Sequence, residues 1–202
     1  MLLAFDTSTA ACTAALFDTD GKCVACKDEM IGRGHAERLV PMIAEMLDGR
    51  TPDSVLVGVG PGSFTGIRVG IAAAHGFAIG WSAKLAGMSS LALLAASAPS
   101  DVDVATAMLG GHSELFVQQF DMAIRPDTAL LNLRPAEAAA AISSCRVIGP
   151  GAAALVEARG WGEAIEAWPS AANAFRLPLV LRQFPADPVY ARAPDAQVRS
   201  AA

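Results

Sequence analysis

Hydrophobic and polar positions follow two different periods along the first half of the chain. Short apolar runs bounded by turn residues predict strands, whereas apolar residues three and four positions apart predict helices. On this basis we expect strands at residues 2–6, 12–17, 22–29, 55–59 and 84–88. We expect helices at residues 35–47 and 66–81, and a third that begins near Ser89 or Ser90, either of which can cap it.

The second half of the chain repeats this order of elements loosely. Its patterns predict strands at residues 102–109, 114–121, 128–133 and 146–148, and helices at 136–142 and 152–159. A βββαβα unit that occurs twice is the plan of the actin-like ATPases. We therefore predict an α/β protein with the actin-like ATPase (ASKHA, RNase H-like) fold, built from two βββαβα lobes with a reduced second lobe. The expected lobes are residues 1–98 and the smaller 99–202, whose tail is expected to return to the first lobe.

Composition narrows the classes of function. The 202 residues are 53% hydrophobic and carry a formal net charge of −5, and the 15 lysines and arginines are scattered along the chain. Nucleic-acid-binding surfaces gather their cations, so contact with RNA is expected only through partners. No apolar run reaches the ~20 residues of a membrane-spanning helix, and residues 1–6 lack a charged leader. We therefore expect a cytoplasmic protein without membrane contact.

Cysteines and histidines do not form a recognisable metal or catalytic motif. Cys23 and Cys26 have metal-ligand spacing, but they lie in a predicted strand that sends them to opposite faces, and no second pair completes a zinc site. All four cysteines are expected to be small, reduced core residues. His35, His75 and His112 are far apart in the sequence, and no nucleophile-elbow motif is present. No metal site and no catalytic residue is predicted.

Two stretches could hold a phosphate group. The turn after the first strand can direct amides and hydroxyls into a cleft, or it can be a simple Asx or ST turn. The glycine-rich loop at residues 60–66 precedes a helix whose N-terminus favours anions, or it is a structural elbow. The candidate phosphate-binding residues are Asp6, Thr7, Ser8, Thr9, Gly60, Gly62, Ser63 and Thr65. A nucleotide-binding ATPase or small-molecule kinase is therefore one hypothesis.

The first two predicted helices carry more apolar surface than one core contact needs. In the first helix, one stripe contains Val40, Ile43 and Leu47, and an adjacent stripe contains Leu39, Met42 and Met46. Pro41 lies within this helix, so a kink or a late helix start is expected. The pair is either deeply buried or an interface with another protein.

Small residues recur in the second of these helices. Gly66, Gly70 and Ala74 follow one another at four-residue spacing, and Gly76 and Gly80 come after them. Each glycine in a helix interior costs about 1 kcal/mol relative to alanine. This cost indicates that another backbone approaches the helix closely.

Several stretches together resemble the TsaB (YeaZ) family. The matching segments are residues 3–9, 35–43, 57–70, 87–91 and 188–192. The most specific of them contains Gly-Pro-Gly-Ser-Phe-Thr-Gly at residues 60–66. The resemblance is dense over residues 1–97 and thin afterwards, apart from the tail. It implies an actin-like fold and a role in the synthesis of N6-threonylcarbamoyladenosine at position 37 of tRNA.

The resemblance also implies partners. Members of this family form homodimers, and bind the related catalytic subunit TsaD, through their first two helices; an ATPase, TsaE, joins the complex. Carried over by position, the partner interface would contain His35, Leu39, Met42, Ile43, Met46, Gly66, Arg68, Gly70 and Ala74. This chain would act as a scaffold or activator, with tRNA contacted only through the complex. It would need no cofactor itself, and ATP and Mg²⁺ would act at the level of the complex.

The resemblance further implies that the chain has no catalytic centre of its own. TsaD binds its metal with a His-x-x-x-His pair directly after the strand that is here 84–88, and those positions are Ser90 and Leu94. Leucine cannot ligate a metal. The chain would thus be a subunit of a threonylcarbamoyl transferase complex without activity alone. It departs from the family at residues 109–112, where Leu-Gly-Gly-His replaces the usual Asp-x-Arg. A peptidase acting on its partner is a further alternative, although no nucleophile or metal set supports it.

Overall fold

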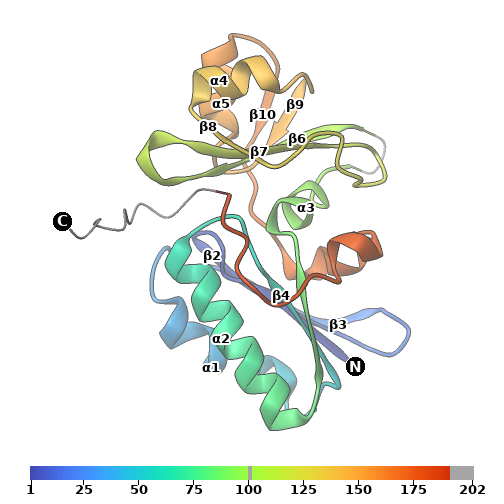
Figure 1. Cartoon of the computed structure of the whole chain (residues 1–202). Coiled ribbons are helices and arrows are strands. Elements are labelled where there is room, and N and C mark those ends of the chain that lie inside the picture. Colours follow the sequence, from blue (N-terminus) through green and yellow to red (C-terminus); the bar gives the residue numbers. More distant parts are fainter. Residues whose placement is uncertain (100–101, 192–202) are drawn as a thin grey trace, which may run out of the picture.

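The computed structural model describes residues 1–99 and 102–191, and two five-stranded sheets dominate it (Figure 1). The first sheet has the order β3-β2-β1-β4-β5. Its strands are Leu2–Asp6 (β1), Ala11–Phe17 (β2), Cys23–Met30 (β3), Ser54–Gly58 (β4) and Lys84–Met88 (β5). Strands β1, β2 and β3 pair antiparallel, whereas β1, β4 and β5 pair parallel.

Both faces of the first sheet are covered. Helices α1 (His35–Leu47) and α2 (Phe64–Trp81) lie on its outer face. Because side chains alternate between the faces of a strand, Leu3 and Phe5 of β1 pack toward these helices, whereas Ala4 packs into the core on the opposite side. Every residue of β2 is buried for the same reason.

The second sheet has the order β10-β9-β6-β7-β8. Its strands are Val104–Leu109 (β6), Leu115–Phe120 (β7), Leu131–Leu133 (β8), Arg146–Ile148 (β9) and Glu163–Ile165 (β10). Helices α4 (Pro135–Ala141) and α5 (Ala152–Arg159) cover its outer face (Figure 1). The segment that departs from the family pattern, residues 109–112, forms the tip of the β6–β7 hairpin together with the short 3-10 turn η1 (Gly111–Ser113).

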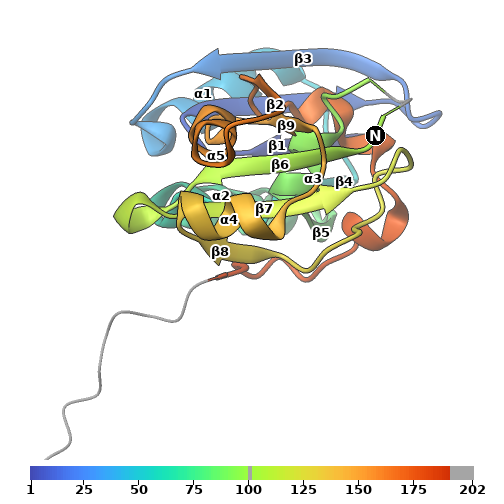
Figure 2. The same cartoon turned by 90° about the horizontal axis from the view of Figure 1, so that it is seen from above.

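Helix α3 (Ser90–Ala95) lies between the two sheets (Figure 1), behind β6 and β7 when the molecule is seen from above (Figure 2), and all six of its residues are buried. Ser89 caps it by accepting a hydrogen bond from the Ala92 amide at 3.2 Å. One continuous hydrophobic cluster surrounds α3 and includes Phe17 and Met88 from the first sheet and Phe120 from the second. The two sheets therefore share a core.

The chain returns to the first sheet after β10, through the 3-10 helices η2 (Ala171–Arg176) and η3 (Leu179–Leu181). Gly87 and Phe184 exchange two backbone hydrogen bonds of 2.7 and 3.0 Å, and the Val189 amide donates to the Val59 carbonyl at 2.8 Å. We call residues 184–191 the C-terminal strap. The strap covers part of the free edge of β5 and reaches the N-terminus of α2 (Figure 1).

The element order confirms the predicted fold, with differences at the boundaries. Helix α2 starts at Phe64 rather than Gly66, because the Ser63 hydroxyl accepts from the Gly66 amide and caps the first turn. The expected strand at residues 128–133 is reduced to β8, and the short strand β10 was not predicted. Ser100 and Asp101 of the expected lobe boundary, and Arg192 of the tail motif, lie outside the described residues. No helix in the described part of the chain is long and apolar enough to cross a membrane.

The expectation that all cysteines are core residues is wrong for two of them. Cys12 is fully buried, and burial raises the pKa of its thiol to about 11. Cys26 and Cys145 are exposed: Cys26 lies in the edge strand β3, and Cys145 directly precedes the short strand β9.

Candidate functional site

Asp6 ends β1 and is completely buried at the point where the two lobes meet. One carboxylate oxygen accepts from the Ser8 amide at 2.7 Å and the Ser8 hydroxyl at 2.6 Å. The other accepts from the Ser90 hydroxyl at 2.5 Å. Both oxygens thus have partners within the chain, in the Asx-turn arrangement that the sequence left open as the structural alternative.

The glycine-rich loop packs directly on this turn. The Thr7 hydroxyl donates to the Gly66 carbonyl at 2.7 Å. A Cβ atom on Gly62 would lie 2.2 Å from the Ser8 carbonyl oxygen, and one on Gly66 would lie 2.0 Å from that of Thr7. On Gly70, it would lie 2.5 Å from the Thr7 hydroxyl. Gly62 and Gly66 therefore admit the backbone of the chain's own first turn, and Gly70 admits the side chain of Thr7.

The two candidate phosphate-binding stretches are adjacent, but most of their polar groups are already engaged. Thr7 and Ser8 are buried, and Gly60 exchanges hydrogen bonds with the Ser90 backbone and hydroxyl at 3.0 and 3.2 Å. Ser63 and Thr65 instead line a cavity of about 380 Å³ between the N-termini of α1 and α2. Arg33 and Glu37 lie on the same wall. Nucleotide binding by this chain stays an alternative hypothesis.

The two residues that the resemblance places at the TsaD metal-ligand positions, Ser90 and Leu94, belong to the core of this chain. Ser90 and Leu94 are both fully buried; Ser90 donates to Asp6, and Leu94 packs in the cluster around α3. His35 is buried and its Nε2 lies 3.3 Å from the Ala11 carbonyl oxygen. Within residues 1–99 and 102–191, no group of three or more His, Cys, Asp or Glu side chains is placed to hold a metal ion.

Of the six residues in the double apolar stripe of α1, only Val40 is exposed. Leu39, Met42, Ile43, Met46 and Leu47 are all buried against the first sheet. Eight of the nine residues expected at a partner interface are buried in the chain itself: His35, Leu39, Met42, Ile43, Met46, Gly66, Gly70 and Ala74. Arg68 is the exposed one. The physical reason is that two helices cover a five-stranded sheet, so each must present a wide apolar arc inward.

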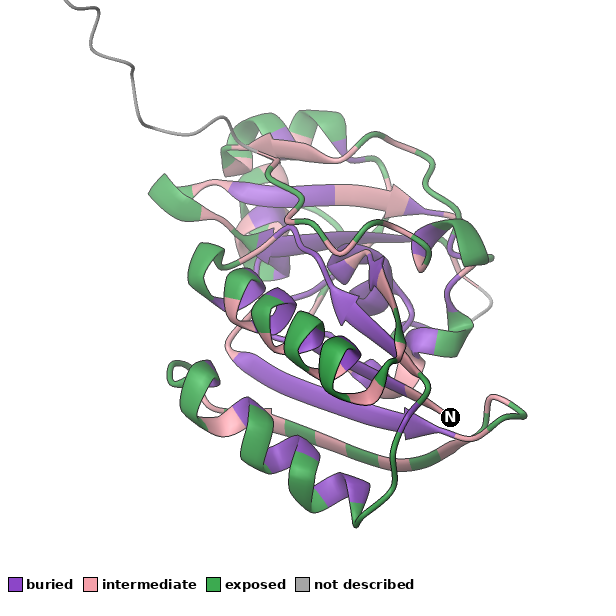
Figure 3. Ribbon diagram, turned by 60° about the horizontal axis from the view of Figure 1, so that its bottom comes forward, coloured by how far each residue is buried: buried purple, intermediate pink, exposed green. Residues whose placement is uncertain are grey.

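The outward side of the two helices is made of other residues (Figure 3). Helix α1 exposes a row of small and branched residues at four-residue spacing, and α2 exposes a row of small residues at the same spacing together with an isoleucine. We call the following residues the helix face: Ala36, Val40, Ala44, Ala72, Gly76, Ile79 and Gly80. Ile79 is 81% exposed, and a Cβ on Gly76 or Gly80 would meet nothing within 4 Å. The helix face is uncharged.

A charged network lies at the α1–β3 side of the helix pair. Arg38 donates to Glu29 with two nitrogens at 2.6 Å and to Glu45 at 3.0 Å, and Lys27 donates to Glu45 at 2.5 Å. The hydrogen bonds from Arg38 and then Lys27 hold the pKa of Glu45 at about 2. The Arg38 hydrogen bonds also lower the pKa of Glu29. All four charges are therefore compensated among themselves.

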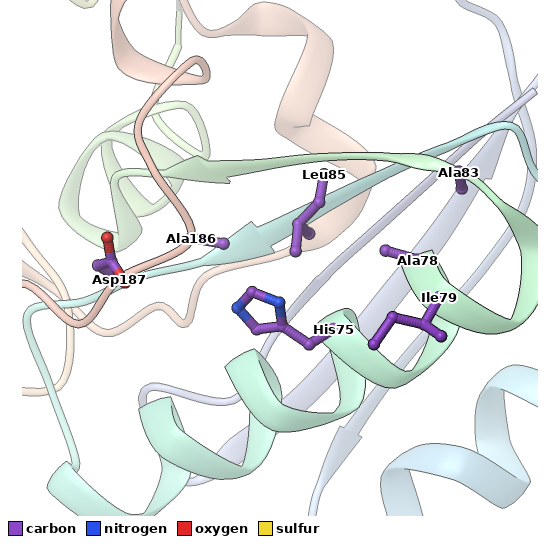
Figure 4. A pocket seen from close by; sticks show the side chains of 7 residues that line it. All are labelled: His75, Ala78, Ile79, Ala83, Leu85, Ala186 and Asp187. Atoms are coloured by element: carbon purple, nitrogen blue, oxygen red, sulfur yellow. The ribbon is translucent and has the colours of Figure 1, made fainter.

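A hollow of about 480 Å³ adjoins the helix face between α2, β5 and the C-terminal strap (Figure 4). His75 projects from α2 toward the strap, and Leu85 of β5 lies above it. The residues that line the hollow are His75, Ala78, Ile79, Ala83, Leu85, Ala186 and Asp187. Its walls are mostly apolar, and Ile79 belongs to both the hollow and the helix face. Such a hollow suits an apolar side chain from a bound protein.

The two sheets, with α3 between them and a helix pair on each outer face, define a protein of the actin-like ATPase fold. A family model described as "TsaD: tRNA N6-adenosine threonylcarbamoyltransferase" matches residues 28–145, which is more than half of the chain. The chain belongs to this family, and it is similar to proteins named TsaB and YeaZ.

Curated relatives and solved structures both support this assignment. TsaB proteins named for tRNA threonylcarbamoyladenosine biosynthesis match from Escherichia coli (38% identity over 102 residues, 48% of this chain and 43% of the relative) and Haemophilus influenzae (40%, 48% and 42%). The match thus spans less than half the length of these relatives. YeaZ from Pseudomonas aeruginosa superposes with a TM-score of 0.78 at 27% identity, covering 94% of this chain and 98% of that one. A second structure, described as similar to peptidase YEAZ from the same organism, gives 0.80 at 28% identity, covering 95% and 99%.

Proposed function

We propose that this chain is a non-catalytic scaffold subunit in the synthesis of N6-threonylcarbamoyladenosine in tRNA, and that it binds a TsaD-like catalytic subunit through the helix face. The names of its relatives support the pathway. The observation that carries the scaffold role is the pair of exposed glycines in α2 that no contact with another described residue requires.

The four interior glycines of α2 separate into two kinds. Gly66 and Gly70 are needed because Thr7 lies against them. Gly76 and Gly80 face open space, so alanine at either position would stabilise the isolated helix by about 1 kcal/mol at no steric cost. A partner helix that packs at the short interaxial distance permitted by small residues gives these glycines a function. Val40 and Ile79 supply apolar area at the same face.

The hydrogen bonds that Asp6 accepts within the chain support the proposal that this subunit is non-catalytic. Its carboxylate oxygens accept hydrogen bonds from Ser8 and Ser90, and a leucine stands at the second metal-ligand position of TsaD. The chemistry would then reside in the TsaD-like subunit. A TsaE-like ATPase, ATP with Mg²⁺, and tRNA would join at the level of the complex, and the chain alone would pair with a second copy through the same helix face.

The experiment places a bulky charge on the helix face and asks whether the complex forms. Gly76→Arg and Ala44→Arg are each mixed with the TsaD-like subunit encoded by the same genome and separated by size-exclusion chromatography. Ala158→Arg is the matched control, because Ala158 is an exposed helical alanine of α5 on the other lobe. Circular dichroism verifies that each variant is folded.

We expect the wild-type chain and Ala158→Arg to co-elute with the TsaD-like subunit and both helix-face variants to elute alone. Burying an unpaired arginine in an apolar contact costs several kcal/mol, enough to remove a micromolar complex. Co-elution of Gly76→Arg and Ala44→Arg at wild-type levels would refute the proposed face.

A further inference from the structure

Arg68 is the one Lys, Arg, Asp or Glu residue of α2, and its side chain is held by two aromatic rings. The guanidinium carbon lies 3.6 Å from the centroid of the Phe64 ring, one helical turn earlier. Its Nε atom donates to the hydroxyl oxygen of Tyr190 at 3.0 Å. Tyr190 belongs to the C-terminal strap, 122 residues further along the chain, and its ring lies 5.6 Å from that of Phe64.

Within residues 1–99 and 102–191, the outer end of this guanidinium has no partner. Among the described residues, no hydrogen bond or ion pair engages either Nη atom, although the chain carries a net charge of −5. By contrast, Arg38, on the neighbouring helix, donates to two carboxylates. Arg68 thus presents the four N–H groups of its Nη atoms at the exposed N-terminal end of α2, next to the helix face.

The contacts of Arg68 with Phe64 and Tyr190 hold its side chain in a conformation suited to binding a carboxylate. A free arginine side chain has about 2 kcal/mol of rotamer entropy, much of which is lost when a partner immobilises it. Here the stacking on Phe64 and the bond to Tyr190 have already restricted the side chain. The planar fork that remains matches a carboxylate, which it binds with two parallel hydrogen bonds.

We propose that Arg68 anchors one carboxylate side chain, aspartate or glutamate, of the TsaD-like partner, and that Phe64 and Tyr190 are the positioning residues that aim it. This inference rests on the proposed function, and it adds a specific polar contact to the apolar contacts of the helix face. The charge pattern favours a protein carboxylate over a nucleic-acid phosphate. Nucleic-acid surfaces carry several cations, whereas Arg68 is followed on α2 by Val69, Ala72 and Gly76. A single charged fork beside small apolar residues is the composition of a protein interface rim.

The test measures the affinity of the purified chain for the TsaD-like subunit by isothermal titration calorimetry. The variants are Arg68→Gln, Arg68→Lys, Tyr190→Phe and the double variant. Arg125→Gln is the control, because it removes one exposed positive charge from the other lobe. Melting temperatures of all variants are measured in parallel, and a filter-binding assay measures the affinity of each for tRNA.

We expect Arg68→Gln to weaken partner binding by about tenfold to a hundredfold, since a hydrogen bond to a charged group contributes about 1.5–3 kcal/mol. Arg68→Lys does not restore the affinity, because an ammonium lacks the planar fork. Tyr190→Phe weakens binding about threefold to tenfold in the wild-type background and has no further effect in Arg68→Gln, a dependence that a purely structural tyrosine would not show. Replacing one partner carboxylate by its amide removes the effect of Arg68→Gln.

Three results would overturn the inference. In the first, Arg68→Gln binds the TsaD-like subunit with an affinity within twofold of wild type, while Gly76→Arg does not bind it. The proposed function would then stand, and the contacts among Arg68, Phe64 and Tyr190 would serve only to hold the C-terminal strap against α2. In the second, Arg68→Gln lowers only the affinity for tRNA, which identifies a phosphate as the ligand. In the third, the wild-type chain itself does not bind the TsaD-like subunit, so the proposed function fails together with the inference.

Discussion

Replacing Ser90 by alanine tests whether its buried hydroxyl has a structural role. The Ser90 hydroxyl donates to the Asp6 carboxylate at 2.5 Å and accepts from the Gly60 amide at 3.2 Å, and both Ser90 and Asp6 are fully buried. The substitution removes one acceptor and one donor and leaves a carboxylate oxygen without its partner. A hydrogen bond to a charged group contributes about 1.5–3 kcal/mol, and an unsatisfied buried group adds to the cost.

We therefore expect Ser90→Ala to lower the free energy of unfolding by about 2–3 kcal/mol, which corresponds to a melting temperature lower by roughly 4–12 °C for a chain of this size. Urea unfolding followed by circular dichroism gives both quantities. Ser54→Ala is the control, because the Ser54 hydroxyl makes an exposed contact with Asp53 and its loss should cost less than about 0.5 kcal/mol. The reconstituted modification reaction should keep its rate below the melting temperature. A loss of stability no larger than that of the control, or a loss of activity in a folded variant, would refute the structural role.

Other contacts in the structure lead to three further predictions. Gly76→Ala should raise the free energy of unfolding by up to about 1 kcal/mol, because the new Cβ would meet no described residue within 4 Å. Gly70→Ala should lower it by about 1–3 kcal/mol, because the new Cβ would lie 2.5 Å from the Thr7 hydroxyl. Denaturant unfolding measures both free energies, and equal effects of the two substitutions would contradict this packing. The pKa of Glu45 is lowered from 4.5 to about 2, so the stability due to the Arg38–Glu45 pair is present above pH 4.5 and is lost as the pH falls toward 2. Arg38→Gln should therefore make the free energy of unfolding depend less on pH in this range. An unchanged pH dependence would count against the pair. Titration of the isolated chain with ATP and Mg²⁺ should give no binding heat, because the Thr7 and Ser8 hydroxyls are engaged within the chain, and saturable heat would restore the ATPase or kinase hypothesis.

The order of elements was predictable because it depends on local periodicity. The apolar run at residues 2–6 and the stripes at 35–47 match β1 and α1 at both ends. Strand β10 was missed because it contains three residues, of which the first two are exposed, so it carries no alternating signal. The capping role of Ser63 moved the start of α2 by two residues.

The surface of the helix pair could not be predicted from periodicity. The arc of Leu39, Met42 and Met46 is equally consistent with burial against the chain's own sheet and against a partner, and the structure has the first. Likewise, nothing in the sequence separates Gly70, which admits Thr7, from Gly76, whose Cβ would meet no described residue within 4 Å. These distinctions depend on long-range contacts, which a single helix pattern does not contain.

Of the two aromatic contacts of Arg68, only the one with Phe64 could be predicted from the sequence. Phe64 and Arg68 are four residues apart at the start of a helix, the spacing at which side chains meet on a helix surface. The partner Tyr190 lies 122 residues away, and only the path of the C-terminal strap brings it to α2. That path begins with the backbone hydrogen bonds between Gly87 and Phe184.

Hydrogen–deuterium exchange of the wild-type chain, with and without the TsaD-like subunit, tests the central claim most directly. If the helix face is the binding surface, amides of residues 36–44 and 72–80 should exchange more slowly in the complex, because binding suppresses local opening of α1 and α2. The amides of α4 and α5, on the opposite lobe, should be unchanged. Slower exchange confined to α4 and α5, with α1 and α2 unaffected, would contradict the account.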